Sequence, residues 1–513
     1  MAAPHSAPAS SIIAPPSTIP PPPSSPNIDV ASASRPSMRT DLSGILHLLT
    51  CGSVDDGKST LIGRLLWDVA DIPEDQKRAI VRASTDGQPD LSLLLDGLVA
   101  EREQGITIDI AWRYFDTASR RLVIIDSPGH EQYTRNMTSG ASHADAAIML
   151  IDARHGVKRQ TRRHAAILDL VGVRHVVLAV NKMDLVDWSQ QRFEEIARDF
   201  AELTANFSFR QATALPVSAI AGDNVTRRSA NLSWFTGPTL LEYLEELPGR
   251  GSERDADFRL PVQTVLRGAG DFRGLAGLIS TGQIQVGDEI RDVLSGQQAR
   301  VRRIATMDGD LARASAGQSI VLQLDRDLDI ARGAILAASN ALPHLMRRFE
   351  ARMVWLADKP LDTDRGLLLR TATDQIPVSA IEVRARLELD TMTEHQIGLC
   401  ATNDIVLTSI TLIRPAAIDT FATHRETGSF VLVDPLSGAT VAGGIVVAIE
   451  DNAPTANNTD AFRLTREIVL SGICADIASK KDAEAEIRRR TDEVVLLLQA
   501  AGISVDVEEP GSR

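Results

Sequence analysis

The sequence predicts an α/β domain with a phosphate-binding loop, followed by two small all-β barrels. Between residues 45 and 248, apolar strands alternate with helical segments, which is the pattern of a doubly wound sheet. After Pro248, short Val- and Ile-rich runs are separated by Gly, Asp and Ser turns, which indicates all-β structure. A glycine-rich turn at 52–59, between the first strand and the first helix, has the composition of a phosphate-binding loop.

The α/β domain is expected to span residues 38–250. Strands are predicted near 45–50, 107–115, 121–126, 145–152, 176–181 and 214–218, and helices near 58–70, 131–141, 158–171, 191–204 and 239–246. Residues 71–100 form an insertion that we expect to be helical. The loops after the strands should gather at the carboxyl edge of the sheet, where such folds bind ligands.

The two barrels are expected at 251–345 and 346–451. The first contains the runs Pro261–Leu266, Ala276–Ser280, Ala299–Ile304 and Ser319–Leu324, and the second extends from Arg348–Trp355 to Gly443–Ile449. After a polar linker, residues 452–513 are predicted to be a short α/β extension with one amphipathic helix near 481–500.

Residues 1–37 are rich in Pro, Ser and Ala and lack the basic start and apolar core of a signal peptide. They are therefore expected to be a disordered leader. Both Met1 and Met38 are possible starts of translation, because Met38 precedes the first predicted strand.

Composition argues against several classes of protein. The net charge of −14 disfavours non-specific binding to nucleic acid or to an anionic membrane. The sequence contains no run of 18 apolar residues, so no membrane-spanning helix is predicted. The cysteines Cys51, Cys400 and Cys474 show neither zinc spacing nor a disulfide framework, so we expect buried thiols in a reducing cytoplasm.

The first motif is the glycine-rich turn, whose backbone N–H groups can cradle phosphates at the amino end of a helix. Lys58 would neutralise β- and γ-phosphate charge, and the Ser59 hydroxyl would bind Mg²⁺. The predicted nucleotide-binding residues here are Gly52, Ser53, Val54, Asp55, Asp56, Gly57, Lys58, Ser59 and Thr60.

The second motif follows the strand 121–126. Asp126 is placed to hold Mg²⁺, through water, and Gly129 would bring a backbone N–H close to the γ-phosphate. His130 is predicted to orient the hydrolytic water and is the catalytic candidate. The whole predicted set is Asp126, Ser127, Pro128, Gly129 and His130.

Two further motifs predict the base. The Asp184 carboxylate can accept hydrogen bonds from both N1–H and N2–H₂ of guanine, whereas adenine offers neither donor there. Backbone N–H groups of the run Ser218, Ala219 and Ile220 are expected to reach guanine O6. With the base-binding run Asn181, Lys182, Met183 and Asp184, the order and spacing of the motifs make the nucleotide GTP.

A switch is predicted at Glu101–Asp109, between the first two motifs. The Thr107 hydroxyl would bind Mg²⁺ while its N–H meets the γ-phosphate, and loss of that phosphate would release the segment. An ordinary loop leading into a strand is the alternative, since Ile106–Trp112 alternates like a strand.

These motifs resemble those of translational-type GTPases, and more closely the large GTPase subunit of bacterial sulfate adenylyltransferase. The similarity covers about 45–450, in segments such as Leu49–Leu66, Asp96–Asp109, Asp126–Met137, Ser218–Asn224, Trp234–Leu240 and Thr427–Phe430. Elongation factors usually carry His where this chain has Ser53. In the family's scheme, Val54 and Ile106 resemble an apolar gate beside the catalytic His130.

The resemblance implies a GTPase subunit, with GTP and Mg²⁺ bound, in a heterodimer or higher multimer with a smaller catalytic subunit. That partner would join ATP and sulfate into adenosine 5′-phosphosulfate and diphosphate, helped by GTP hydrolysis here. The alternative is an elongation-factor-like GTPase that delivers an aminoacyl-tRNA. Some family members carry a fused adenylylsulfate kinase, but residues 468–480, which contain Gly472, lack the second Gly and the Lys-Ser pair of another phosphate loop.

Overall fold

The computed structural model describes residues 45–70, 72–83, 89–95, 107, 109–117, 119–248, 256–268, 272–363, 365–396 and 399–449, with short pieces at 462–464, 489–491, 494 and 505–507. The predicted leader and most of the predicted 481–500 helix lie outside the described residues. The predicted domain boundaries at 250 and 451 fall in or beside segments that are also outside them, so these boundaries stay predictions.

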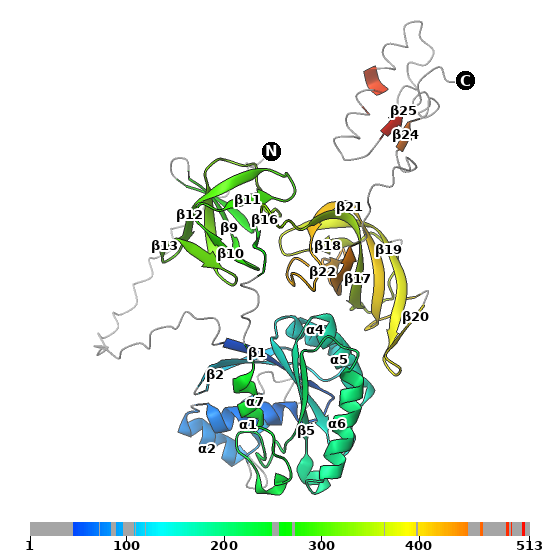
Figure 1. The fold of residues 1–513 in the computed structure, drawn as a ribbon. Coiled ribbons are helices and arrows are strands. Elements are labelled where there is room, and N and C mark those ends of the chain that lie inside the picture. Colours follow the sequence, from blue (N-terminus) through cyan, green and yellow to red (C-terminus); the bar gives the residue numbers. More distant parts are fainter. Residues whose placement is uncertain are drawn as a thin grey trace, which may run out of the picture. The chain divides into compact units, whose positions relative to one another are not determined.

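A six-stranded sheet forms the first part of the described chain, and Figure 1 labels three of its strands, β1, β2 and β5. The strand order is β2-β3-β1-β4-β5-β6. All neighbouring pairs are parallel except β2 and β3. The strands are β1 (Ile45–Gly52), β2 (Ala111–Asp116), β3 (Arg121–Asp126), β4 (Ala146–Asp152), β5 (His175–Asn181) and β6 (Gln211–Pro216). Since β1 lies between β3 and β4, the loops after β1 and β3 meet where the strand order reverses, which is the usual ligand position in such sheets.

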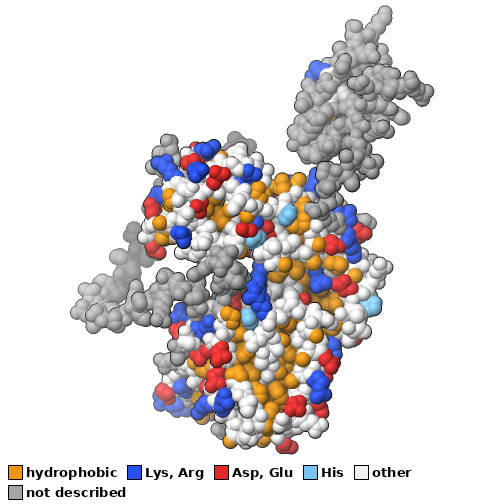
Figure 2. All heavy atoms as spheres, viewed as in Figure 1, with side chains coloured by type: hydrophobic (Ala, Val, Ile, Leu, Met, Phe, Trp, Pro, Cys, Tyr) orange, Lys and Arg blue, Asp and Glu red, His pale blue; other side chains and the backbone are white. Residues whose placement is uncertain are grey.

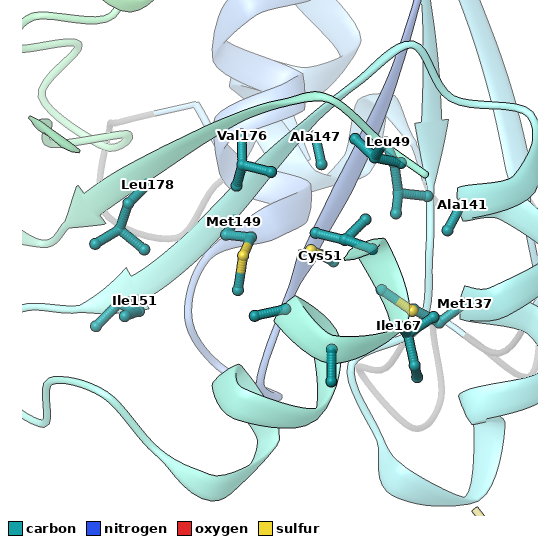
Figure 3. Close-up of a cluster of buried hydrophobic side chains, with 14 of the residues drawn as sticks. Leu49, Cys51, Met137, Ala141, Ala147, Met149, Ile151, Ile167, Val176 and Leu178 are labelled. Carbon is teal, nitrogen blue, oxygen red and sulfur yellow. The ribbon is translucent and has the colours of Figure 1, made fainter. Parts of the chain in front are cut away.

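Helices cover both faces of this sheet. One face packs against α1 (Lys58–Val69) and α7 (Leu240–Glu246), and the other against α4 (Thr134–Ser142), α5 (Arg159–Leu170) and α6 (Gln190–Thr204). Figure 3 shows the second interface, where Leu49, Cys51 and Met149 of the sheet meet Met137 and Ile167 of the helices. Short 3₁₀ turns are η3 (Glu131–Tyr133), η4 (Met183–Val186) and η5 (Ala230–Leu232). The predicted doubly wound arrangement is confirmed.

Two sequence expectations needed correction in this domain. The strand predicted at 107–115 begins only at Ala111, because Asp109 lies in a bend where its carboxylate accepts the Ile110 N–H at 2.7 Å. The strand predicted at 214–218 ends at Pro216, and the Ser218 N–H instead donates to the Asp223 carbonyl. The insertion at 71–100 contains α2 (Glu74–Ala83) and the 3₁₀ turn η2 (Leu91–Leu94).

The next strands form a sheet that closes on itself. The pairing order is β7-β16-β11-β12-β15-β9-β8, with β13 beside β12 and a separate β10-β14 ribbon. The two end strands of that order, β7 and β8, are consecutive in the chain, so the sheet curls into a barrel. The strands are β7 (Arg259–Pro261), β8 (Thr264–Arg267), β9 (Arg273–Leu278), β10 (Gln283–Gln285), β11 (Glu289–Asp292), β12 (Gln298–Thr306), β13 (Gly309–Leu311), β14 (Arg313–Ser315), β15 (Ser319–Leu324) and β16 (Ile335–Ala338).

The predicted run 261–266 is not one strand. Its Val262 N–H donates to the Ala334 carbonyl, and the next N–H, of Gln263, donates to Ala276 on another strand. The segment therefore changes partners at a barrel corner, which alternation in the sequence does not reveal.

The second barrel closes through β18, which pairs with both β22 and β19. The ring is β18-β22-β23-β17-β21-β19, with β20 attached to β19. Its strands are β17 (His344–Trp355), β18 (Leu368–Arg370), β19 (Gln375–Glu388), β20 (Thr393–His395), β21 (Ile405–Ile418), β22 (Ser429–Val433) and β23 (Thr440–Ile449). Near the end, β24 (Phe462–Leu464) pairs in parallel with β25 (Val505–Val507). An α/β domain followed by two small barrels is therefore confirmed.

Acidic and basic side chains are interspersed over the face of the molecule in Figure 2.

Cys51 and Cys400 are buried and free, and burial raises the pKa of each thiol to about 12. Cys474 lies outside the described residues. Among the helices that the structure describes, none is long and apolar enough to cross a membrane.

Candidate nucleotide-binding site

The phosphate loop connects β1 to α1 through a left-handed glycine. Gly57 has φ of +90°, a backbone conformation that side chains rarely adopt, and a Cβ added there would lie 2.4 Å from Asn181 Nδ2. Asp55 is also left-handed, with φ of +67°. The loop therefore has its shape because Gly57 leaves room for a side chain from the base-binding motif.

Lys58 lies inside this loop and is only 7% exposed. Its Nζ donates to the carbonyls of Gly52 at 3.1 Å and Ser53 at 2.8 Å. Burial lowers the pKa of the Lys58 ammonium, against the raising effect of nearby carboxylates, chiefly Asp126. A buried cation held by two carbonyls is positioned to attract an anion.

Gly129 packs directly against this lysine. A Cβ at Gly129 would lie 2.4 Å from Lys58 Nζ and 2.6 Å from the Gly52 carbonyl oxygen. The second motif thus approaches the phosphate loop by backbone alone, and any side chain at 129 would collide with the loop.

Asp126 ends β3 opposite Thr50 of β1. It is buried, and Thr50 Oγ1 donates to its Oδ1 at 3.1 Å. Ser127 Oγ in turn donates to the Thr50 carbonyl at 2.7 Å. These contacts fix the carboxylate at the carboxyl edge of the sheet, and Ser59 is the second residue of α1.

Asn181 connects the phosphate loop to the base-binding loops. Its Nδ2 donates to the Asp56 carbonyl at 2.9 Å, and its Oδ1 accepts the Ala219 N–H at 2.9 Å. The side chain is 2% exposed, so water does not substitute readily for either bond. Three motifs far apart in the sequence therefore form one hydrogen-bonded unit.

Asp184 and its neighbours are held from several sides. Ser218 Oγ donates to Asp184 Oδ1 at 2.6 Å. The backbone of Lys182 is in the left-handed conformation. The Lys182 Nζ donates to the Asp55 carbonyl and lies 3.0 Å from Asp152 Oδ2. Met183 is buried and fixes the run against the core.

The N–H groups of Ser218, Ala219 and Ile220 are the predicted donors to guanine O6, but the first two have partners within the protein. The Ser218 N–H donates to Asp223, and the Ala219 N–H donates to Asn181. The Ala221 N–H also donates, to Ser218 Oγ at 3.2 Å. In the described part of the chain, the Ile220 N–H is the one in this stretch that meets no acceptor.

His130 is exposed and caps the amino end of the 3₁₀ turn η3. Its Nδ1 accepts the Gln132 N–H at 3.3 Å, and its ring lies 6.0 Å from that of Tyr133. Gln160 of α5 donates to the Gly129 carbonyl just before it, at 3.4 Å. Thr107 is half-buried, whereas the predicted gate residue Ile106 lies outside the described residues.

Sequence reasoning missed several charged residues at the site. Asp152, at the end of β4, accepts hydrogen bonds from both Arg154 and Lys182. Burial alone would raise the pKa of Asp152, but the hydrogen bonds from these two cations hold it well below its usual range. Lys158 lies 3.7 Å from Asp56, whose pKa is raised by burial. A carboxylate directly after an apolar strand was the available signal for Asp152.

Arg64 was missed as well, although it lies in a segment that carried the family resemblance. From α1, it donates to the carbonyls of Ala219 and Ile220 in the loop after β6. No local pattern in the sequence predicts a contact between Arg64 and the loop at 219–220, because these residues are far apart in the chain.

Two family models match the chain. The Elongation factor Tu GTP binding domain matches residues 43–249, and the GTP-eEF1A C-terminal domain-like model matches residues 348–447. The first contains every predicted nucleotide motif. The described α/β domain is therefore a GTP-binding domain of this kind.

Relatives that match about four fifths of the chain indicate a more specific family within these GTP-binding proteins. The chain is 43% identical to "Sulfate adenylyltransferase subunit 1" of Saccharophagus degradans, over 82% of this chain and 90% of the relative. It is 46% identical to the protein of that name from Methylorubrum extorquens (strain PA1), over 81% of this chain and 91% of the relative. It is also 46% identical to "Bifunctional enzyme NodQ" of Rhizobium sp. (strain N33), over 79% of this chain, and spans only 63% of that relative's length.

One solved structure, the "crystal structure analysis of sup35 complexed with GMPPNP", matches 82% of this chain and 98% of its own, at 25% sequence identity. The TM-score of this match is 0.37.

Proposed function

The chain belongs to the sulfate adenylyltransferase subunit 1 family, and on this premise we propose that it is the GTPase subunit of a sulfate-activating complex. GTP hydrolysis on this chain is coupled to the synthesis of adenosine 5′-phosphosulfate and diphosphate from ATP and sulfate. The synthesis takes place on a smaller catalytic subunit. The elongation-factor alternative is not favoured, because the relatives that match over most of their length carry the sulfate enzyme's name.

One observation carries the nucleotide part of this proposal. The side chain of Asn181 bonds the Asp56 carbonyl of the phosphate loop and the Ala219 N–H of the base loop at the same distance of 2.9 Å. The phosphate end and the base end of a bound nucleotide are thus kept at a fixed separation before any ligand arrives. Pre-organisation of this kind lowers the entropy cost of binding.

Guanine is the base that suits the polar groups. Asp184, held by Ser218 Oγ, presents carboxylate oxygens that accept from N1–H and N2–H₂ of guanine. Adenine would instead place its N1 acceptor against a carboxylate. GTP is therefore the proposed ligand, with Lys58 and the loop N–H groups on its phosphates.

The residues at the phosphate end also fit Mg²⁺. The donor set is the Ser59 hydroxyl and, through water, the buried Asp126 carboxylate, which is the small oxygen set that Mg²⁺ uses beside nucleotide phosphates. Thr107 would add its hydroxyl when the switch closes. When bound, the ion supplies charge neutralisation between the β- and γ-phosphates.

Hydrolysis is assigned to the chain's own groups around Gly129. The Gly129 N–H would sense the γ-phosphate at close range, since no Cβ intervenes. His130 would orient the attacking water, for which its exposed ring must turn toward the loop. Coupling to the partner would pass through Thr107 and Gly129, the two groups that depend on the γ-phosphate.

Copurification tests the proposed assembly. The tagged full chain, expressed in a host that also expresses a small adenylyltransferase subunit, is expected to purify with that subunit and with no tRNA. Recovery of the chain with bound aminoacyl-tRNA, and without the adenylyltransferase, would overturn the proposal and favour a delivery factor.

A further inference from the structure

Two side chains from one turn of α1, Arg64 and Asp68, form hydrogen bonds with the loop that follows β6. Arg64 Nε donates to the Ala219 carbonyl at 3.1 Å, and its Nη2 donates to the Ile220 carbonyl. One turn later on α1, Asp68 lies 3.6 Å from Arg64 and accepts from Thr226 Oγ1 at 2.8 Å. The Arg64–Asp68 pair therefore contacts both ends of the stretch from 219 to 226.

The side chains of this pair are well shielded. Arg64 and Asp68 are 15% and 10% exposed, so water competes weakly with their bonds to the Ala219 carbonyl and to Thr226, although the bond to the Ile220 carbonyl is exposed. The loop also packs against the apolar part of the arginine side chain. A Cβ added at Gly222, which has φ of +81°, would lie 3.5 Å from Arg64 Cδ. Arg64 thus acts as a template for the loop as well as a donor to it.

The contact from Arg64 fixes the direction of the peptide group between Ala219 and Ile220. The Ala219 carbonyl and the Ile220 N–H belong to one trans peptide unit, so they point in opposite directions. Because Arg64 holds the carbonyl, the Ile220 N–H is turned away from α1. It is also the N–H of this stretch that meets no acceptor in the described part of the chain, since Ser218, Ala219 and Ala221 all donate within the protein.

We propose that Arg64 is a positioning residue for guanine recognition, which aims the Ile220 N–H at the 6-oxo group of the base. The proposal rests on the GTP site proposed above. Arg64 lies six residues after Lys58, about 9 Å along the same helix. One rigid element thus holds the phosphates at its start and sets the geometry of base readout further along.

A set of three nucleotides separates this role from a general structural one. GTP and ITP both carry the 6-oxo group, and ITP lacks only the 2-amino group that Asp184 would bind. The triphosphate of 2-aminopurine riboside keeps the 2-amino group and the phosphates but has no 6-oxo group. Dissociation constants for all three, with Mg²⁺, are measured on the full chain by competition.

In Arg64→Met, the dissociation constants of GTP and ITP are expected to rise together by about tenfold, with that of the 2-aminopurine nucleotide unchanged within about twofold. Arg120→Met is the matched control. Arg120 also donates to two carbonyls, of Leu244 and Leu247, but these end α7 and take no part in the proposed site. This control should bind all three nucleotides like the unmodified chain.

Equal weakening of all three nucleotides by Arg64→Met would mean that the arginine only supports α1, and would overturn the inference. Unchanged binding of GTP would overturn it too. If Arg64→Met does not fold, Thr226→Val, which removes the second contact of the pair, must produce the same selective loss on a smaller scale. A lack of GTP preference in the unmodified chain would instead refute the GTP site itself.

Discussion

Replacing Asn181 by alanine removes the side chain that joins the phosphate loop to the base loop. The Asp56 carbonyl and the Ala219 N–H each lose a 2.9 Å hydrogen bond in a place that is almost inaccessible to water. A buried group left without its partner costs about 1–3 kcal/mol. For two such groups, with some relaxation of the loops, we expect about 2–4 kcal/mol.

Part of this cost should appear in GTP binding, because the ligand would then have to bring the two loops into register itself. The full 2–4 kcal/mol corresponds to a rise in the GTP dissociation constant of about 30-fold to about 1,000-fold. Isothermal titration calorimetry with Mg²⁺ measures it directly. Asn206→Ala, at an exposed position after α6, is the control and should bind GTP normally.

An Asn181→Ala variant that binds GTP within about threefold of the unmodified chain would refute this reasoning. It would mean that the two loops keep their separation without the bridge. Since β1, β4 and β5 are parallel neighbours in the sheet, their backbone alone would then be sufficient to position both motifs.

Four further outcomes follow from the site. Asp184→Asn should shift preference from GTP toward xanthosine triphosphate, because the amide offers a donor where xanthine carries its 2-oxo group; equal affinity of the unmodified chain for GTP and ATP in calorimetry would contradict the assignment. His130→Ala should lower GTP turnover by about 10²-fold with little change in GTP affinity, whereas Lys58→Ala should weaken both; normal turnover by the His130 variant within the complex would show that its role is misassigned. Burial lowers the pKa of His164 to about 3, so the folded state keeps this ring neutral while the unfolded chain takes up a proton below about pH 6.5. Stability should therefore fall as the pH drops from 6.5 toward 3, by up to about 1.4 kcal/mol per pH unit from this residue; thermal unfolding of His164→Leu should show a shallower acid dependence, and identical slopes would contradict the assignment. Thr107→Ala should leave the two subunits associated but abolish the effect of GTP on sulfate activation, and GTP stimulation that survives the change would place the coupling elsewhere.

The order of strands and helices and the order of the nucleotide motifs could both be predicted from the sequence. The reason is that each rests on local properties: apolar periodicity for the elements, and Gly57, Lys58 or Asp184 at fixed offsets for the motifs. Boundaries were less predictable where a side chain competes with the backbone. Asp109, for example, accepts a backbone N–H and delays the start of β2.

Contacts between distant segments were beyond local patterns. Arg64 contacts the loop at 219–220, and Lys158 contacts Asp56, only because the sheet brings these segments together. Similarly, two of the three donors predicted for guanine O6 have partners that only the fold reveals. Ser218 and Ala219 have the expected position in the chain, but their N–H groups bond Asp223 and Asn181.

Synthesis of adenosine 5′-phosphosulfate is the measurement closest to the central claim. The assay compares the purified chain, the small catalytic subunit, and the two together, each with ATP and sulfate and with GTP, a non-hydrolysable GTP analogue or no guanine nucleotide. Because the condensation is uphill, product should accumulate well only when both subunits and hydrolysable GTP are present. Product from the single chain, or equal accumulation with and without GTP hydrolysis in the complex, would contradict the account.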